Sequence, residues 1–363
     1  MNIFDLYTDY IQITMGAATA TGLSNLLDNQ ISHDQITRAL AKLNATGKDV
    51  WHNVKSLVRQ HEADDACLIF DDSIIHKPYT DENDIVCWHY DHCQNRNVKG
   101  MNLLTAFYHT QSNNEKLPLK VPIAFEVIHK YQYCDIETKK EKRVSPVTKN
   151  ELMRDMINQA IRNQLKFKYI LADSWFGANE NMRFIHKKKK YFIFDIKTNR
   201  LVTIMDRNKG SWARLDSLSI LPNTPTRVWL KDLEIQVLLM KQVFTNKDNS
   251  TGVRYLVSNN LNLIKQDFED TYKKRWSVEE YHKSIKQNTA ISKSPTRTIA
   301  TQTAHIFASI ISYIKFEKYK FSTKLNHFAL KSKLYYKATK TAFSELMNLK
   351  LQHEKFEKLY NAA

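Results

Sequence analysis

The sequence predicts an α/β fold in which helices cover a mixed β-sheet, and three observations support this prediction. Short apolar runs that end at acidic or turn residues alternate with amphipathic stretches through residues 63–197. Their order is strand, strand, strand, helix, strand, helix, strand, which implies a mixed sheet covered by helices. Helical patterns occupy both ends of the chain, residues 1–62 and 301–363.

The first segment, residues 1–62, has helical patterns. Ser32 is a candidate N-cap with Gln35 three residues later, and apolar residues follow from Ile36 at helical spacing. A second amphipathic segment occupies residues 50–58. We expect this region to be either a small DNA-binding unit or a helical cap on the next domain.

The second segment, residues 63–197, supplies the sheet and its helices. A helix is indicated where apolar residues form one stripe, and a strand where a short apolar run is bounded by turn residues. The expected strands are 66–70, 98–108, 121–128, 167–172 and 191–196, and the expected helices are 150–165 and 179–189.

Three further segments complete the predicted organisation. Residues 198–262 are rich in short strands separated by turn residues, which is typical of a β insertion. Residues 263–300 begin with a helix at about 266–286, and residues 301–363 are helical and basic. At 363 residues the chain is long enough for two or three domains.

Composition excludes several classes of protein. Gly and Pro number 7 each and hydrophobic residues make up 42%, which argues against collagen-like, Pro-rich and largely disordered chains. The longest apolar stretch, around 305–316, is shorter than the roughly 20 residues that span a bilayer. The first residues lack the pattern of a secretory signal, and four cysteines are too few to staple the chain. We therefore expect a cytoplasmic protein with no membrane partner.

The charge points to a polyanionic partner. The chain has 54 Lys and Arg residues against 38 Asp and Glu residues, a formal net charge of +16. Residues 261–363 hold 19 of these basic residues against 9 acidic ones. Such an excess attracts nucleic acid, although basic composition alone does not identify a ligand.

Two aspartates end apolar strands of the predicted sheet. Asp71 follows the run 66–70, and Asp173 follows the run 167–172. Side chains at the ends of neighbouring strands can converge, and a carboxylate there is costly unless it is solvated or coordinated. The alternative is that each residue is an ordinary turn or strand-end aspartate.

A third acid lies on the predicted helix at 266–286. Steps of three and four residues place the acid on one face with a tyrosine and basic residues. This face would suit a metal-bound carboxylate beside a phosphodiester, but it is equally typical of a solvated stripe with one ion pair. The members of this face are Tyr272, Arg275, Glu279, Lys283 and Lys286.

The spacing of four of these residues resembles a known family. Tyr272, Arg275, Glu279 and Lys286 match the Tyr-Arg-Glu-Lys signature of DDE transposases in the insertion-sequence-four superfamily. Further segments resemble other parts of this family: 71–73 its first-aspartate motif, 171–174 its second, 89–92 and 98–102 the stretch between them, and 31–38 its N-terminal region. The resemblance covers roughly residues 1–310.

This resemblance implies an RNase H-like catalytic core with a β insertion between the second aspartate and the glutamate. It implies that Asp71, Asp173 and Glu279 are catalytic and hold Mg²⁺, for which Mn²⁺ substitutes, in a two-metal phosphoryl transfer. The family pattern places the metal ligand two residues before a Ser or Thr, so Asp71 is expected to bind metal and Asp72 to support it.

The resemblance also implies a partner and a reaction. The substrate would be double-stranded DNA, both the transposon ends and the target, and the protein would act as a homodimer on paired ends. DNA contacts are expected from Tyr272, Arg275, Lys283 and Lys286. The reaction would be metal-dependent strand cleavage and strand transfer.

Three alternatives stay open from the sequence. One is an RNase H-like nuclease that hydrolyses DNA without joining it, and another is an inactive copy that represses through DNA binding. The third concerns Cys87, His89, His92 and Cys93, which could bind zinc, although their spacing matches no usual zinc framework.

Overall fold

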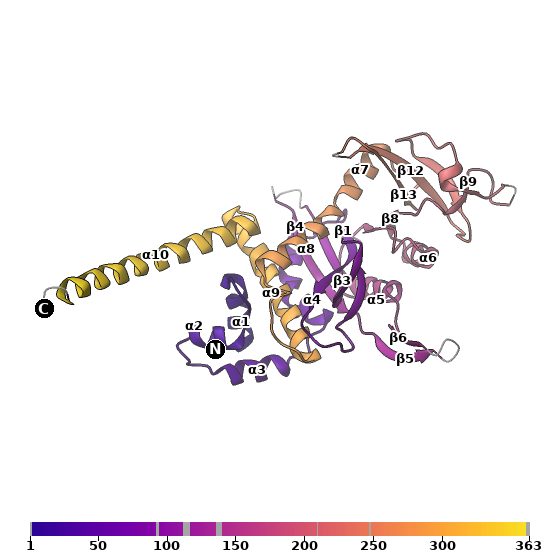
Figure 1. Ribbon diagram of the computed structural model, residues 1–363. Helices are drawn as coiled ribbons and strands as arrows, with labels where there is room; N and C mark the ends of the chain where they lie inside the picture. The colour runs from indigo at the N-terminus through magenta and orange to yellow at the C-terminus, as the bar shows by residue number, and fades with distance from the viewer. Residues whose placement is uncertain are drawn as a thin grey trace.

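The computed structural model describes residues 2–91, 94–111, 117–135, 140–208, 210–246 and 248–360. It has the predicted α/β architecture, with a large mixed sheet between helices (Figure 1). The helices are α1 (Ile3–Ile13), α2 (Ala20–Leu26), α3 (His33–Ala41), α4 (Gly47–His61), α5 (Lys149–Arg162), α6 (Asn179–Lys187), α7 (Lys265–Lys273), α8 (Trp276–Asn288), α9 (Ile299–Thr323) and α10 (His327–Tyr360), with a 3₁₀ turn η1 (Leu215–Ser217).

The strands form one long sheet and a separate hairpin. The hydrogen-bonded order in the large sheet is β10-β9-β11-β12-β13-β8-β7-β1-β3-β2, with β4 also paired to β3. The strands are β1 (Cys67–His76), β2 (Cys87–Asp91), β3 (Arg96–Thr110), β4 (Leu119–Val127), β7 (Tyr169–Ala172), β8 (Tyr191–Asp195), β9 (Leu201–Thr203), β10 (Ala213–Arg214), β11 (Thr226–Leu230), β12 (Gln236–Thr245) and β13 (Thr251–Ser258), and the hairpin pairs β5 (Tyr131–Asp135) with β6 (Lys140–Val144).

The N-terminal region is helical as predicted. Ser32 caps α3, because its hydroxyl accepts a hydrogen bond from the Gln35 backbone N–H at 3.3 Å, and the Gln35 side chain accepts from the Ser32 backbone N–H at 2.9 Å. Helices α1 and α3 pack against α9, and α4 packs on β4. Helix α4 therefore covers part of the sheet, whereas α1 and α3 lie against α9.

Parallel pairing at the centre of the sheet fixes where its strands end. Strand β1 is parallel to β7, and β7 is parallel to β8, while β3 runs antiparallel to β1. The carboxyl ends of β7 and β8 therefore lie beside the middle of β1, which continues to His76.

The strands predicted within residues 198–262 are present and continue this sheet. Strand β13 pairs antiparallel with β8, and β12, β11, β9 and β10 follow in order. They lie beyond β8, away from α4 and α9 (Figure 1).

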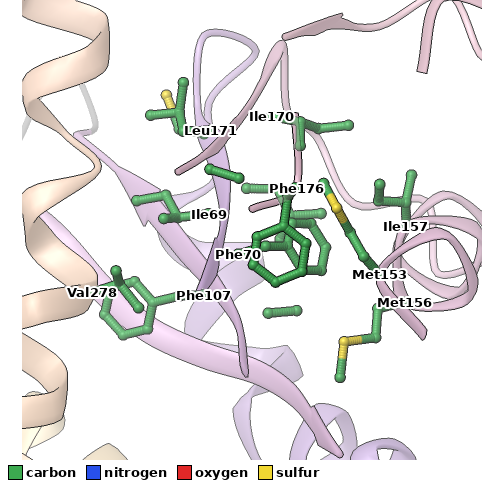
Figure 2. Packing of buried hydrophobic residues seen from close by; sticks show 14 of the residues in the cluster. Ile69, Phe70, Phe107, Met153, Met156, Ile157, Ile170, Leu171, Phe176 and Val278 are labelled. Carbon is green, nitrogen blue, oxygen red and sulfur yellow. The ribbon is translucent and has the colours of Figure 1, made fainter. Parts of the chain in front are cut away.

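Side chains alternate between the two helix-covered faces of the sheet. Ile69 and its cross-strand neighbour Phe107 face α8, where the Phe107 ring packs on Tyr281 in a tilted arrangement with centroids 5.1 Å apart. Phe70 points to the opposite face, toward Met153 of α5 (Figure 2). Because alternation continues along the strand, the residue after Phe70 faces α8 again.

The C-terminal helices differ in their surroundings. Residues 301–317 of α9 are almost entirely buried. Helix α10 begins beside α1 and then projects from the body of the molecule (Figure 1). Across the described ranges, no helix combines the length and apolar character that a bilayer span requires.

Candidate active site

Three parallel strands each place an aspartate at the same level of the sheet. Asp71 lies within β1, which continues to His76, so the predicted strand 66–70 is too short. Phe70 of β1 pairs with Ala172 of β7, which pairs with Phe194 of β8. Asp71, Asp173 and Asp195 are the next residues on these three strands. Strand alternation turns all three carboxylates toward the face that carries α8.

Helix α8 brings a fourth acid to this edge. The helix is fixed against the sheet by Tyr281, which packs on Phe107, and by the Ser277 hydroxyl, which lies 2.7 Å from Nδ1 of His109. Glu279 projects from the same helix toward β1. Ligand atoms of Glu279, Asp71 and His282 all lie within 4.8 Å of one another.

The electrostatics of Asp71 show that the negative charge around it exceeds the compensation from Arg275. Burial, and then the negative charge of Glu279, raise the pKa of Asp71 well above its ordinary value. Asp173 and Asp72 act in the same direction, and the Arg275 guanidinium opposes them. A divalent cation between these acids would compensate the repulsion, because carboxylate oxygens are its preferred ligands.

Asp173 lies beside this group rather than inside it. Burial raises the pKa of its carboxyl, although Oδ1 accepts a hydrogen bond from the Trp175 backbone N–H at 3.0 Å. The structure therefore brings Asp71 and Glu279 into close contact range and places Asp173 on the adjacent strand, where its charge is felt by Asp71.

Asp72 is held by a hydrogen bond and an ion pair, and its charge also raises the pKa of Asp71 and of Asp173. Its carboxylate accepts from Nδ2 of Asn102 at 2.7 Å and pairs with Nζ of Lys149 at 2.9 Å. The same ammonium lies 4.5 Å from the ring centroid of Trp175, an exposed side chain two residues after Asp173. These contacts link Asp72 of β1 to the loop that follows β7.

The predicted single helix at 266–286 is wrong, because the chain divides it into α7 and α8. Hydrogen bonds from residue i to i−3 replace the α-helical pattern, with the Arg275 backbone N–H donating to Tyr272 O at 2.9 Å. Tyr272 therefore lies in the last turn of α7 and Glu279 in the first turn of α8, while Lys274 and Arg275 between them keep helical dihedral angles.

The break places Arg275 between the tyrosine and the acid. Its guanidinium lies 5.7 Å from the Tyr272 ring centroid, and its Nη1 is 3.3 Å from Oε1 of Glu279. Tyr272 itself is only 5% exposed, and its hydroxyl lies 3.5 Å from Ala172 O. Lys283 and Lys286 are exposed on α8.

Sequence reasoning missed two residues of the site, Asp195 and His282. Asp195 also ends an apolar strand, so the signal used for Asp71 and Asp173 could have found it. His282 follows Glu279 by three residues, a spacing that places both side chains on one helix face.

The possible zinc site is only partly within the described residues. Cys87 and His89 point to the buried side of β2, with Sγ and Nε2 3.3 Å apart. His92 and Cys93 lie outside the described residues. Within the described ranges the group of potential metal ligands is the one at Asp71.

Two family models match the chain. One, described as a DDE superfamily endonuclease, matches residues 13–208, which is more than half of the chain. The other, described as a transposase DDE domain, matches residues 146–315. No curated protein shows a significant match to the chain.

The acids at the sheet edge fall within these matches. The first match contains Asp71 and Asp173, and the second contains Asp173 and Glu279. Proteins with these domains act on DNA and generally use divalent metal ions, typically Mg²⁺. The chain belongs to the DDE superfamily of endonucleases and carries a transposase DDE domain.

Proposed function

We propose that the protein is a transposase of the insertion-sequence-four superfamily, which cleaves the ends of its own element and joins them to target DNA. The observation that carries this proposal is the meeting of carboxylates from distant segments at one sheet edge. Asp71 and Asp173 come from adjacent parallel strands, and Glu279 comes from α8. The family matches support a transposase, and the Tyr-Arg-Glu-Lys spacing favours this superfamily.

Asp71, Asp173 and Glu279 are proposed to hold two Mg²⁺ ions, with Mn²⁺ as a substitute. When bound, such ions activate the attacking oxygen of an in-line displacement and stabilise the leaving oxygen. Water would first cleave the phosphodiester at the element end and free a 3′-hydroxyl. That hydroxyl would then attack the target strand in the same site.

Positive groups around the acids are proposed to bind the DNA backbone. Arg275 can fork onto a phosphate, while Lys283 and Lys286 supply point charges on the exposed side of α8. Tyr272 is buried beneath Arg275, so its proposed role is to hold the guanidinium in position. The exposed Trp175 ring offers a surface on which a displaced base could stack.

The remaining regions are assigned by their position. The strands between β8 and α7 are proposed to be the β insertion of the RNase H-like core, and the N-terminal and basic C-terminal helices are candidates for reading the inverted repeats. We further propose that two copies pair on the synapsed ends, in the cytoplasm where the chromosome lies.

An end-joining assay tests the proposal. Labelled DNA that carries the inverted repeats flanking the coding sequence is incubated with the protein, Mg²⁺ and a supercoiled plasmid. A transposase yields labelled plasmid, whereas a nuclease yields shortened labelled DNA without joining. Protein that binds the ends but leaves both DNAs intact in Mg²⁺ and in Mn²⁺ would refute the catalytic assignment.

Variants locate the activity. Asp71→Asn, Asp173→Asn and Glu279→Gln keep the side-chain shape and remove the charge, so each should abolish cleavage and leave end binding intact. Glu280→Gln is the matched control, because the neighbouring Glu280 is exposed and pairs with Lys120 at 2.7 Å instead of facing the site. Cleavage that survives in one of the three variants removes that residue from the site.

A further inference from the structure

His282 is a buried imidazole at the candidate site that the proposed reaction does not use. It lies on α8 one turn after Glu279, and only 7% of the residue is exposed. Its Nδ1 is 3.7 Å from Oδ2 of Asp71. Its Nε2 is buried and has no hydrogen-bond partner among the described residues.

The contact with Asp71 is too long for a hydrogen bond. Hydrogen bonds between nitrogen and oxygen have distances of about 2.7–3.2 Å. The Asp71 carboxylate therefore does not hold the His282 ring by a hydrogen bond. Among the described residues, Nδ1 therefore makes no hydrogen bond to Asp71 and is available to another partner.

The same distance fits two ligands of a common cation. Ligand atoms about 2.0–2.2 Å from one ion are separated by roughly 3–4.4 Å, depending on the angle between them. The 3.7 Å separation of Nδ1 and the Asp71 oxygen lies in this range, and Glu279 completes a group whose ligand atoms are all within 4.8 Å.

We propose that His282 is a nitrogen ligand of the divalent ion held by Asp71 and Glu279. This inference rests on the proposed metal-dependent function and deepens it, because it makes the donor set at this ion mixed rather than purely carboxylate. A neutral imidazole keeps the lone pair of one ring nitrogen free to bind a metal.

A mixed donor set predicts a metal preference. Mg²⁺ favours oxygen ligands, whereas imidazole nitrogen suits transition metals. Replacing His282 by Asn should therefore weaken Mn²⁺ binding by at least about tenfold, and Mg²⁺ binding by less. Calorimetric titration of each ion into the full-length protein measures this difference.

Pulsed electron paramagnetic resonance of Mn²⁺ tests the ligand directly. The probe is Mn²⁺ alone, added to the full-length protein at less than one equivalent. Direct coordination by imidazole should give nitrogen modulation in the wild-type spectrum, and growth on ¹⁵N-histidine should change that modulation to the ¹⁵N pattern. His282→Asn should remove it, while His186→Asn, at an exposed histidine of α6, should keep it.

The outcomes separate this inference from the proposed function. Mn²⁺ that binds without any histidine modulation overturns the ligand assignment and leaves the carboxylate site in place. Modulation that persists in His282→Asn assigns the nitrogen to another residue and also overturns it. Failure of the wild-type protein to bind Mn²⁺ contradicts the proposed function itself. Circular dichroism establishes that the variant is folded, and the ¹⁵N experiment needs only the wild-type chain.

Discussion

Replacing Asp195 by Asn should stabilise the metal-free protein at neutral pH. The side chain of Asp195 is 28% exposed, and its nearest cation is Arg254, with Nε 4.0 Å from Oδ2. Burial raises the pKa of Asp195 to about 6, because Arg254 compensates only part of the cost and the neighbouring Asp173 adds repulsion. The ionised carboxylate is therefore less favourable in the folded chain than in the unfolded one.

The sign and size of the effect follow from linkage. The ordinary pKa is 3.8 and the folded value is about 6, so the folded state binds more protons between these values, and its stability falls as pH rises through them. At pH 7.5 the ionised group costs at most about 3 kcal/mol at roughly 1.4 kcal/mol per pKa unit. Roughly 1.4 kcal/mol of this cost develops between pH 5 and pH 7.5.

Thermal unfolding in EDTA at several pH values measures this effect. From the usual entropy of unfolding per residue, the gain between pH 5 and pH 7.5 corresponds to about 2 °C in the midpoint of a chain this long. Asp232→Asn removes one negative charge from an exposed turn and serves as the control. An Asp195→Asn protein that is less stable than the parent at pH 7.5, or whose advantage does not change with pH, would refute the reasoning.

Three other predictions follow from the same contacts. Arg275→Ala or Lys286→Ala should weaken end binding and reduce the salt slope of log K by about 1, measured by fluorescence anisotropy, and an unchanged slope would exclude a phosphate contact. Burial would raise the pKa of Glu317, but its hydrogen bond with His327, 3.0 Å long, and the charge of a nearby lysine lower it. This stabilisation is present above the ordinary pKa of 4.5 and is lost as pH falls through the lowered value, so Glu317→Gln should cost about 3–5 kcal/mol in urea unfolding at pH 7. A cost that does not shrink as pH falls below 4.5 would contradict it. Mg²⁺ at a hundred times its dissociation constant should stabilise the wild type by about 2.7 kcal/mol and Asp71→Asn by much less, and equal stabilisation would place the ion elsewhere.

The sheet and two of its acids could be predicted because their signals are local. An apolar run that stops at an acid indicates a strand end, and this holds for Asp173, which directly follows β7. The same pattern at Asp71 does not mark a strand end, because β1 continues to His76. The predicted strand 191–196 extends one residue past Asp195, so this pattern does not single out that aspartate. The strand-rich stretch after β8 was also predicted, but its pairing with β8 was not, since hydrogen-bonded neighbours leave no mark in a single sequence.

The rest of the site depends on contacts between distant segments. Helical spacing predicts one continuous helix, and periodicity does not reveal the tightened turn at residues 274–275 that divides α7 from α8. The Tyr272 hydroxyl donates to the carbonyl oxygen of Ala172, which lies 100 positions earlier in the chain. A histidine on a buried helix face is usually a core residue, so the sequence alone indicates no metal-binding role for His282. Its position beside Asp71 in the folded chain indicates that role.

Anomalous diffraction from crystals grown with Mn²⁺ tests the central claim most directly. We expect a manganese peak beside Asp71 of β1, within about 2.3 Å of oxygens from Asp71 and Glu279. Asp173 should contact this ion or a second one. Strong peaks elsewhere, with none between these carboxylates, would contradict it.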